Sequence, residues 1–282
     1  MSTLYLVATP IGNLGDLSPR AREILSTVDF IAAEDTRVTQ KLLTACELPR
    51  KPMISYYEHN RRARGEAVLE KLLAGETCAL VTDAGTPAVS DPGEDLVALC
   101  AEHDIPVIPV PGCCAAVCAL AASGLPTGRW CFEGFLSVNK KARREHLDAL
   151  EGEKRTMIFY EAPHKLCATL RDLAAAFGED RRLSLSRELT KLHEQTLRMT
   201  LGEAMRYFDE NPPRGEFVLI VEGAPDEPET EQSEEERLAA AAEAVRRRIE
   251  QGQTQKDAVK AVSAEVGVKK NALYRYVLEN EE

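Results

Sequence analysis

The sequence predicts an α/β protein with two α/β domains, the first built on a parallel five-stranded sheet and the second on a mixed sheet, followed by a small helical domain. Two observations lead to this prediction. Short apolar, β-branched runs without polar alternation recur between helical stretches, as strands buried on both faces of a parallel sheet do. The 282 residues also exceed what one hydrophobic core usually holds, so more than one domain is expected.

Five apolar runs in the first domain, residues 1–112, are predicted strands, and helical stretches separate them. This alternation predicts a parallel sheet with right-handed crossovers. The expected strands are Leu4 to Ala8, Phe30 to Ala33, Met53 to Tyr57, Ala79 to Thr82 and Ile105 to Val110. Pro111 and Gly112 end the fifth strand. The small residues from Cys113 to Ala122 then predict a helix at the start of the second domain.

The loop after the fourth strand, Asp83 to Pro87, is the first candidate for a ligand site. It places a carboxylate at a strand end, and its Gly85 tolerates positive φ and lets a ligand approach the backbone. Asp91 then suits the N-cap of the next helix, with Pro92 at the first helical position. Small molecules bind at the carboxyl ends of the strands in open α/β sheets. A tight strand-to-helix turn without a ligand is the alternative.

The loops after the second and third strands also carry polar residues and are expected at the same edge of the sheet as Asp83 to Pro87, while the loop after the first strand resembles a nucleotide-binding turn. Thr9 to Asp16 has two glycines, but neither the G-x-G-x-x-G spacing of a dinucleotide fold nor the Lys-Ser/Thr of a P-loop, which disfavours NAD and ATP. Glu34 to Arg37 and Tyr56 to Asn60 follow the second and third strands. Helix capping explains Asn60, and Asp35 or Thr36, but leaves Glu34 and Arg37 without a structural role.

The second domain, residues 113–224, is expected to hold a mixed sheet with antiparallel members. Its predicted strands are Trp130 to Phe135, Thr156 to Tyr160, Leu183 to Ser186, Thr196 to Thr200 and Glu216 to Val221. Between the first two lies a basic run without acids, which contains Lys140, Lys141, Arg143 and Arg144. This run is either a solvated helix face or a patch that contacts phosphate.

Residues 225–233 have the composition of an acidic linker, and residues 234–282 have the spacing of a helix-turn-helix-like helical domain. Thr254, with Asp257 three residues later, predicts a capped second helix, and Gly267 predicts the turn after it. This tail is mildly basic between residues 252 and 276. It is therefore expected to contact either RNA or another protein.

The formal net charge of −11 would ordinarily disfavour a nucleic-acid partner. Seven acids fall between Asp226 and Glu236, however, so the remainder of the chain is only mildly acidic. The eight cysteines lie mostly in apolar runs without C-x-x-C or neighbouring His spacing, which predicts reduced, buried thiols and no metal site. The start of the chain lacks a positively charged leader, and no apolar run is long enough to span a bilayer. A cytoplasmic protein without membrane segments is expected.

Six motifs, in order along the chain, resemble the tetrapyrrole-methylase-like superfamily of S-adenosylmethionine enzymes, and within it the enzymes that methylate small-subunit ribosomal RNA. They are Thr9 to Leu14, Ala33 to Arg37, Val81 to Pro87, Pro109 to Gly112, Tyr160 to His164 and Arg187 to Lys191. The resemblance implies 2′-O-methylation of a cytidine in the decoding region of 16S ribosomal RNA, within the small ribosomal subunit. It also implies a homodimer, with S-adenosyl-L-methionine folded in a cleft between the two α/β domains.

The resemblance assigns expected roles to individual residues. The expected cofactor contacts are Thr9, Pro10, Gly12, Asn13, Asp83, Ala84, Gly85, Thr86, Pro87, Cys113, Ala115 and Ala116. A ribose hydroxyl is a weak nucleophile, so a side chain that takes its proton should be in reach. The candidates are Glu34, Glu161, His164, Glu188 and Lys191, and the expected RNA contacts are Arg37, Lys140, Lys141, Arg143 and Arg144.

Two other functions are compatible with these motifs. One is methylation of a precorrin-type tetrapyrrole, because the motifs at the cofactor are shared with those enzymes. The other is a non-catalytic RNA-binding ribosome assembly factor that uses the basic tail. The preservation of charged strand ends together with two glycine loops argues against a purely structural core.

Overall fold

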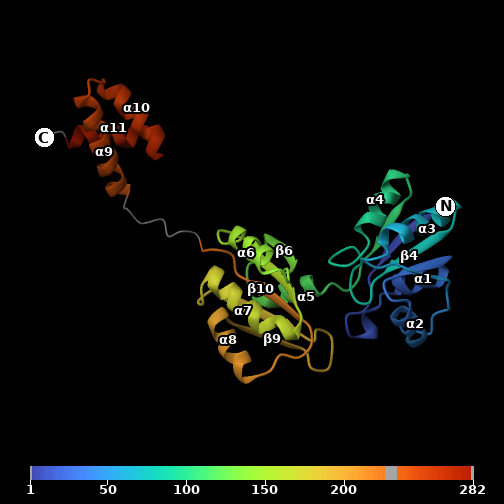
Figure 1. The fold of residues 1–282 in the computed structure, drawn as a ribbon. Helices are drawn as coiled ribbons and strands as arrows, with labels where there is room; N and C mark the ends of the chain where they lie inside the picture. The colour runs from blue at the N-terminus through green and yellow to red at the C-terminus, as the bar shows by residue number, and fades with distance from the viewer. Residues whose placement is uncertain (1, 226–233, 281–282) are drawn as a thin grey trace. The chain divides into compact units, whose positions relative to one another are not determined.

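The computed structural model describes residues 2–225 and 234–280 of the chain. It comprises two compact units, Met1–Ala224 and Pro225–Glu282, and each is described here by itself (Figure 1). All but the first residue of the predicted acidic linker, 225–233, lies outside the described residues.

The first unit begins with a five-stranded sheet in the order β3-β2-β4-β1-β5, in which every pairing is parallel. This confirms the predicted parallel sheet. The strands are β1 (Thr3–Val7), β2 (Phe30–Ala33), β3 (Met53–Ser55), β4 (Thr77–Val81) and β5 (Val107–Val110). Their carboxyl ends share one edge, because parallel strands all run in the same direction.

Helices cover both faces of this sheet, since neighbouring residues of each strand point to opposite sides. Ile31 packs with Leu25 and Leu43 on one face, and Phe30 packs with Leu72 and Leu96 on the other. The short 3₁₀ helix η1 (Leu14–Asp16) precedes the helices α1 (Pro19–Thr27), α2 (Thr36–Ala45), α3 (Arg61–Leu73) and α4 (Glu94–Glu102). The α1 and α2 pair and the α3 and α4 pair therefore form two separate layers.

Two predicted helix caps are wrong. Gly93, at φ 147°, is the N-cap of α4, and no side chain caps that helix. The loop reaches it through Ala88 and Ser90, both at φ 65°, which carries Asp91 away from the helix end. Asn60 precedes α3 without capping it, because its side chain accepts from the Tyr57 amide and donates to the Ser55 carbonyl.

A second five-stranded sheet follows in the order β6-β7-β10-β8-β9. Only β6 and β7 pair in parallel, and the remaining pairs are antiparallel, which confirms the predicted mixed sheet. The strands are β6 (Trp130–Phe135), β7 (Thr156–Glu161), β8 (Arg182–Arg187), β9 (Gln195–Thr200) and β10 (Phe217–Val221). A register shift between Phe132 and Gly134 interrupts the β6–β7 ladder.

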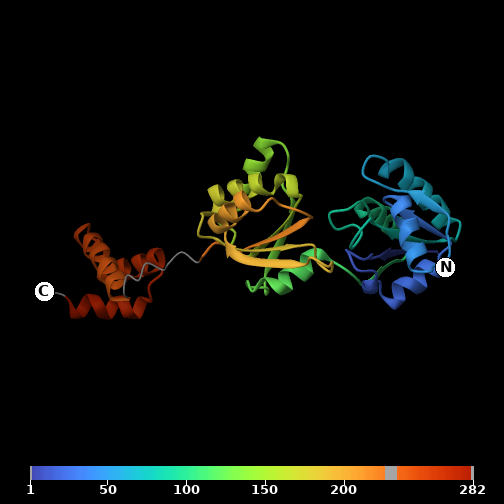
Figure 2. The same ribbon diagram turned by 90° about the horizontal axis from the view of Figure 1, so that it is seen from below.

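The second sheet is also a middle layer between helices (Figure 2). Helix α5 (Ala115–Ser123) packs against Ile158, Val218 and Ile220 on one face. The other face carries α6 (Lys140–Ala149), α7 (Pro163–Phe177) and α8 (Leu201–Glu210), which bury Leu147, Leu170 and Ala204 respectively. Each sheet thus has its own core, and the division between the domains at residues 112 and 113 stays a prediction.

The second unit contains the three predicted helices, α9 (Glu234–Glu250), α10 (Gln255–Val266) and α11 (Lys270–Glu279). Thr254 caps α10 by accepting from the Asp257 amide, and Gly267 ends it in the left-handed conformation. Val245, Val259 and Leu273 pack at the centre of a separate core.

Across the described parts of the chain, no helix has both the length and the apolar character needed to cross a bilayer. The same residues hold no group of three or more His, Cys, Asp or Glu side chains arranged to bind a metal ion. All eight cysteines are free thiols, but only Cys46, Cys78 and Cys100 are buried and Cys118 is exposed, so the expectation of mostly buried thiols is wrong.

Candidate active site

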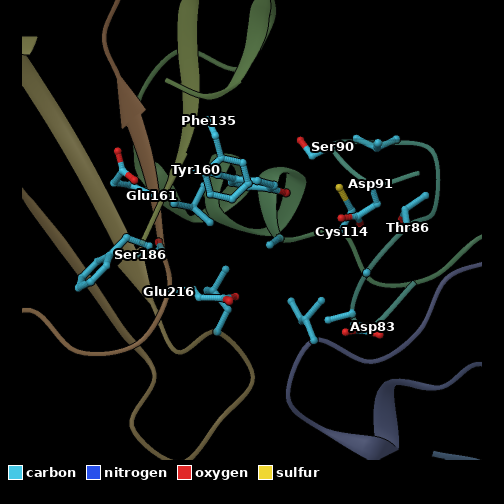
Figure 3. A pocket seen from close by; sticks show the side chains of 18 of the residues that line it. Asp83, Thr86, Ser90, Asp91, Cys114, Phe135, Tyr160, Glu161, Ser186 and Glu216 are labelled. Atoms are coloured by element: carbon cyan, nitrogen blue, oxygen red, sulfur yellow. The ribbon is translucent and has the colours of Figure 1, made fainter. Parts of the chain in front are cut away.

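A cavity of about 400 Å³ lies where the carboxyl-end loops of the first sheet meet an edge of the second. This volume is within the roughly 300–1,000 Å³ of small-ligand clefts. Figure 3 shows Asp83, Thr86, Ser90 and Asp91 on one side and Phe135, Tyr160, Glu161, Ser186 and Glu216 across from them.

The loop with Gly85 is held in place by the end of β1. Thr9 and Gly85 exchange two backbone hydrogen bonds, at 2.8 and 3.0 Å, and the Thr9 hydroxyl donates to the Thr82 carbonyl at 3.2 Å. The φ of Gly85 is 90°, a positive value, as predicted, and only glycine adopts it without strain. On the far side of the loop, the Thr86 hydroxyl donates to the Cys113 carbonyl at 2.9 Å. The loop is therefore pre-formed at the cavity wall.

The cavity is strongly acidic. One cation, Lys191, lines it together with six carboxyl side chains: Glu34, Asp83, Asp91, Glu161, Glu188 and Glu216. Burial, followed by the nearby carboxylates of Glu34, Asp83 and Glu216, raises the pKa of Asp91 to about 7. Burial also raises the pKa values of Glu34 and Asp83, although each accepts a backbone hydrogen bond. The wall formed by the first domain thus favours a ligand that carries positive charge.

Glu161, at the end of β7, is only 2% exposed, and other side chains fix its orientation. One carboxylate oxygen accepts from the Ala162 amide at 2.9 Å, and the other accepts from the Thr169 hydroxyl at 2.5 Å. Arg143 donates to the same hydroxyl at 2.8 Å and pairs with Asp172. This chain of contacts connects the cavity to α6 and α7.

Backbone strain marks the loop after β8. Glu188 and Thr190 have φ values of 52° and 66°, in the left-handed region that non-glycine residues rarely adopt. The Lys191 ammonium donates to the Glu188 carboxylate at 3.0 Å. A Cβ at Gly12 would come within 2.5 Å of the Lys191 side chain, so Gly12 lets the first loop approach this one. Strain that packing maintains at a cavity is typical of a functional site.

The cavity brings together only part of the predicted cofactor set. Asp83, Ala84, Gly85, Thr86 and Ala115 line it. The lining does not include Thr9, Pro10, Gly12, Asn13, Pro87, Cys113 or Ala116. Several of these shape the walls instead, since Asn13 caps η1 and the Ala116 amide donates to the Tyr160 hydroxyl.

Four of the five predicted catalytic candidates, Glu34, Glu161, Glu188 and Lys191, line the cavity, whereas His164 is exposed and lies outside the lining. Sequence reasoning missed Asp91 and Glu216. Asp91 was interpreted as a helix cap. Glu216 precedes β10, which runs antiparallel to β7, so Phe217 pairs with Glu161 and the beginning of β10 reaches the same edge as the end of β7. The signal for it was an acidic residue at the beginning of a strand in a sheet predicted to have antiparallel members.

The predicted RNA contacts have different environments. Lys141 and Arg144 are about 85% exposed and make only loose i,i+4 pairs with Glu145 and Asp148, both at 3.7 Å, while Lys140 is exposed. Arg37 is also 85% exposed and pairs with Asp35. Arg143 differs, because its side chain is 12% exposed and faces Asp172 on α7. Its expected place on the exposed basic surface is therefore wrong.

Comparison with known proteins shows which class of protein has this fold. Residues 3–205 match the family described as Tetrapyrrole (Corrin/Porphyrin) Methylases. Among solved structures, the methyltransferase CobJ superimposes with a TM-score of 0.59 at 21% identity, covering 79% of this chain and 95% of that one. A uroporphyrin-III C-methyl transferase from Thermus thermophilus, complexed with S-adenyl homocysteine, gives 0.53 at 19% identity, covering 77% and 96%. These likenesses define the class as a methylase fold.

Curated relatives are similar over a longer stretch. The ribosomal RNA small subunit methyltransferase I of Synechocystis sp. is 50% identical over 281 residues, which is 100% of this chain and 99% of the relative. The protein of the same name from Escherichia coli O157:H7 is 46% identical, covering 99% and 95%. The chain belongs to the tetrapyrrole methylase family and, within it, to the group of ribosomal RNA small subunit methyltransferase I.

Proposed function

We propose that this protein transfers a methyl group from S-adenosyl-L-methionine to the ribose 2′-hydroxyl of a cytidine in the decoding region of 16S ribosomal RNA. One observation carries the choice of RNA over a tetrapyrrole. The two methylases of known structure described above cover 79% and 77% of the chain, whereas the Synechocystis ribosomal RNA methyltransferase covers all of it, the tail included. The share that they leave uncovered is about the size of the second unit, Pro225–Glu282.

The cavity fits this methyl donor. A sulfonium and an ammonium both carry positive charge, and carboxylates at Glu34 and Asp83 suit them. Ile11, Val89 and Phe135 add an apolar surface of the kind that a nucleoside base requires. Bound there, the cofactor supplies an electrophilic methyl group.

The side chains of the cavity position the ribose and accept its proton. As the hydroxyl oxygen bonds to the methyl carbon, that carbon's bond to sulfur breaks and the hydroxyl proton passes to a carboxylate. A base works best when its pKa is near the working pH. Asp91 meets this condition, because burial raises its pKa to about 7. Glu161 and the Glu188–Lys191 pair, on the opposite wall, orient the sugar.

RNA binding is assigned to exposed basic residues outside this cavity. The proposed phosphate contacts are Lys140, Lys141 and Arg144 on α6 and Arg37 on α2. The helical tail supplies further RNA affinity, and we propose a cytoplasmic homodimer. Light scattering tests the dimer, because a single 31.1 kDa species at micromolar concentration would contradict it.

Methyl transfer tests the proposal directly. Immature small ribosomal subunits and a precorrin are offered with labelled S-adenosylmethionine, and the labelled RNA is digested to nucleosides. We expect label in 2′-O-methylcytidine and none in the corrinoid. Label in the corrinoid alone would overturn the RNA assignment, and label on a base would overturn the ribose assignment. A protein that binds subunits but neither the donor nor its demethylated product would instead be an assembly factor.

A further inference from the structure

A second cavity of about 260 Å³ lies beside the last residue of β8 and is lined by Arg187, Tyr207, Phe208, Asn211, Pro212 and Arg214. We refer to it as the arginine cavity. No carboxylate is among these six residues, whereas six carboxyl groups line the cavity of the candidate active site, which we refer to as the acidic cavity. Two arginines facing one hollow without acids form an anion site by charge, and their guanidinium groups match phosphate geometry.

The arginines are available for a ligand. Arg187 donates to the neutral side-chain oxygen of Gln195 at 2.8 Å through Nε. Among the described residues, no carboxylate pairs with its two terminal nitrogens. Arg214 is exposed and, within the described residues, has no ion pair or side-chain hydrogen bond. Neither guanidinium is neutralised by a carboxylate, and Asn211 and Tyr207 add polar groups to the same hollow.

The arginine cavity adjoins the acidic cavity through two short pieces of backbone. Ser186 lines the acidic cavity, and the next residue, Arg187, lines the arginine cavity. Arg187 also pairs across the sheet with Phe217, which lines the acidic cavity. Arg214 lies two residues before Glu216, which lines the acidic cavity. Between them, Gly215, at φ 78°, lies so close to Glu188 that an added Cβ would come within 2.3 Å of its carboxylate oxygen. The wall between the cavities is therefore thin.

A nucleotide within an RNA strand brings a phosphate on each side of its ribose. The carboxylates of the acidic cavity repel such groups, and its one cation, Lys191, is already paired with Glu188. We propose that the arginine cavity binds a backbone phosphate of the substrate RNA next to the nucleotide whose ribose enters the acidic cavity. This inference rests on the proposed function and deepens it, because it assigns the strand a path over the wall formed by Glu188 and Gly215.

The test compares Arg187→Gln, Arg214→Gln and Arg214→Lys with Arg62→Gln, an exposed arginine on α3 outside both cavities. Binding to small ribosomal subunits is measured over a range of salt concentrations, together with affinity for S-adenosylhomocysteine. Each Gln variant should weaken subunit binding roughly fivefold near 0.15 M salt and lower the salt slope by about 0.7–0.9 per lost contact. Arg214→Lys should keep the slope, and cofactor affinity should not change.

The outcomes separate the inference from the proposed function. If the wild-type protein methylates the RNA while Arg214→Gln keeps the wild-type salt slope, the arginine cavity is wrong and the function stands. Arg214 is exposed, so Arg214→Gln should fold and can test the arginine cavity even if Arg187→Gln fails to fold. Calorimetry with inorganic phosphate gives a further outcome. If phosphate binds the wild-type protein and not Arg214→Gln, but both proteins bind subunits equally, the arginine cavity takes a free anion. The proposal that it binds an RNA phosphate is then overturned. If the wild-type protein methylates no RNA, the proposed function and the inference about the arginine cavity both fail.

Discussion

The Thr169 hydroxyl donates a hydrogen bond to the buried carboxylate of Glu161 at 2.5 Å. The same hydroxyl oxygen accepts from Arg143, so one side chain of α7 connects the cavity wall to a cation on α6. Glu161 has a second donor in the Ala162 amide, and both its oxygens are therefore oriented before any ligand binds. A carboxylate held in this way cannot rotate freely to suit other ligands, which favours a single binding geometry.

Replacing Thr169 with Val removes this hydroxyl and keeps the side-chain volume. The Thr169→Val variant should lose about 1–3 kcal/mol in the free energy of unfolding, because a buried carboxylate and Arg143 each lose a partner. Urea unfolding measures this loss, and methyl transfer should fall with it. Thr169→Ser, which retains the hydroxyl, is the control and should recover most of both. Equal loss in the two variants would show that packing, and not the hydrogen bond, is responsible.

Asp91 should make stability depend on pH. Its pKa in the folded chain is raised to about 7 by burial, while an unfolded aspartate titrates near 4. The folded chain therefore holds a proton that the unfolded chain releases, and the free energy of unfolding falls as the pH rises from about 4 to about 7. Asp91→Asn should be more stable than the wild-type protein above pH 7, with a difference that shrinks toward pH 4.

Activity provides a second measurement on Asp91. The wild-type rate of methyl transfer should rise with pH through about 7 as the carboxylate forms, and Asp91→Asn should lack this rise. Urea unfolding and methyl transfer between pH 5.5 and 8.5 measure both effects. A variant with the wild-type pH–rate profile would remove Asp91 from the proposed role of base.

Two glycine variants distinguish the effect of the positive φ of Gly85 from the effect of its position at the cavity. Gly85→Val should abolish binding of S-adenosylmethionine, because a β-branched side chain is strained at φ 90° and would alter the loop beside Ile11 and Cys113. Gly75→Val is the matched control, with φ 96° and nothing within 4 Å of an added Cβ. Calorimetric titration of both variants checks this. If the two lose affinity equally, general destabilisation accounts for the effect.

The basic residues of α6 should divide into two kinds. Changing Lys140, Lys141 and Arg144 together to Ala should flatten the salt dependence of subunit binding by roughly 0.7–0.9 per lost contact and leave thermal stability nearly unchanged. Arg143→Ala should instead lower the free energy of unfolding by about 1–2 kcal/mol, because Asp172 and Thr169 lose their partner. Salt titrations and thermal unfolding of both proteins test this. An unchanged salt slope in the triple variant would remove α6 from the RNA surface.

The strands and the order of the domains were predictable from local pattern. The run at Phe30–Ala33 matches β2, whose four residues are all buried, because burial on both faces requires apolar residues wherever the chain pairs. Gly85 was predictable for a similar reason, since the need for positive φ is a property of one residue. The place of three loops at the cavity was also predictable, because parallel strands bring their carboxyl ends to a shared edge. They are the loops that contain Ile11, Glu34 and Asp83.

The remaining parts of the site depended on contacts that only the tertiary structure brings about. Glu216 reaches the cavity because β10 pairs antiparallel with β7, and a local pattern does not specify which partner a strand finds. Asp91 enters the cavity because the loop before α4 turns through residues at positive φ. Arg143 turns to Asp172 because α6 packs beside α7. Sequence periodicity determines which residues are buried, whereas long-range pairing decides which charged groups meet and so where their pKa values lie.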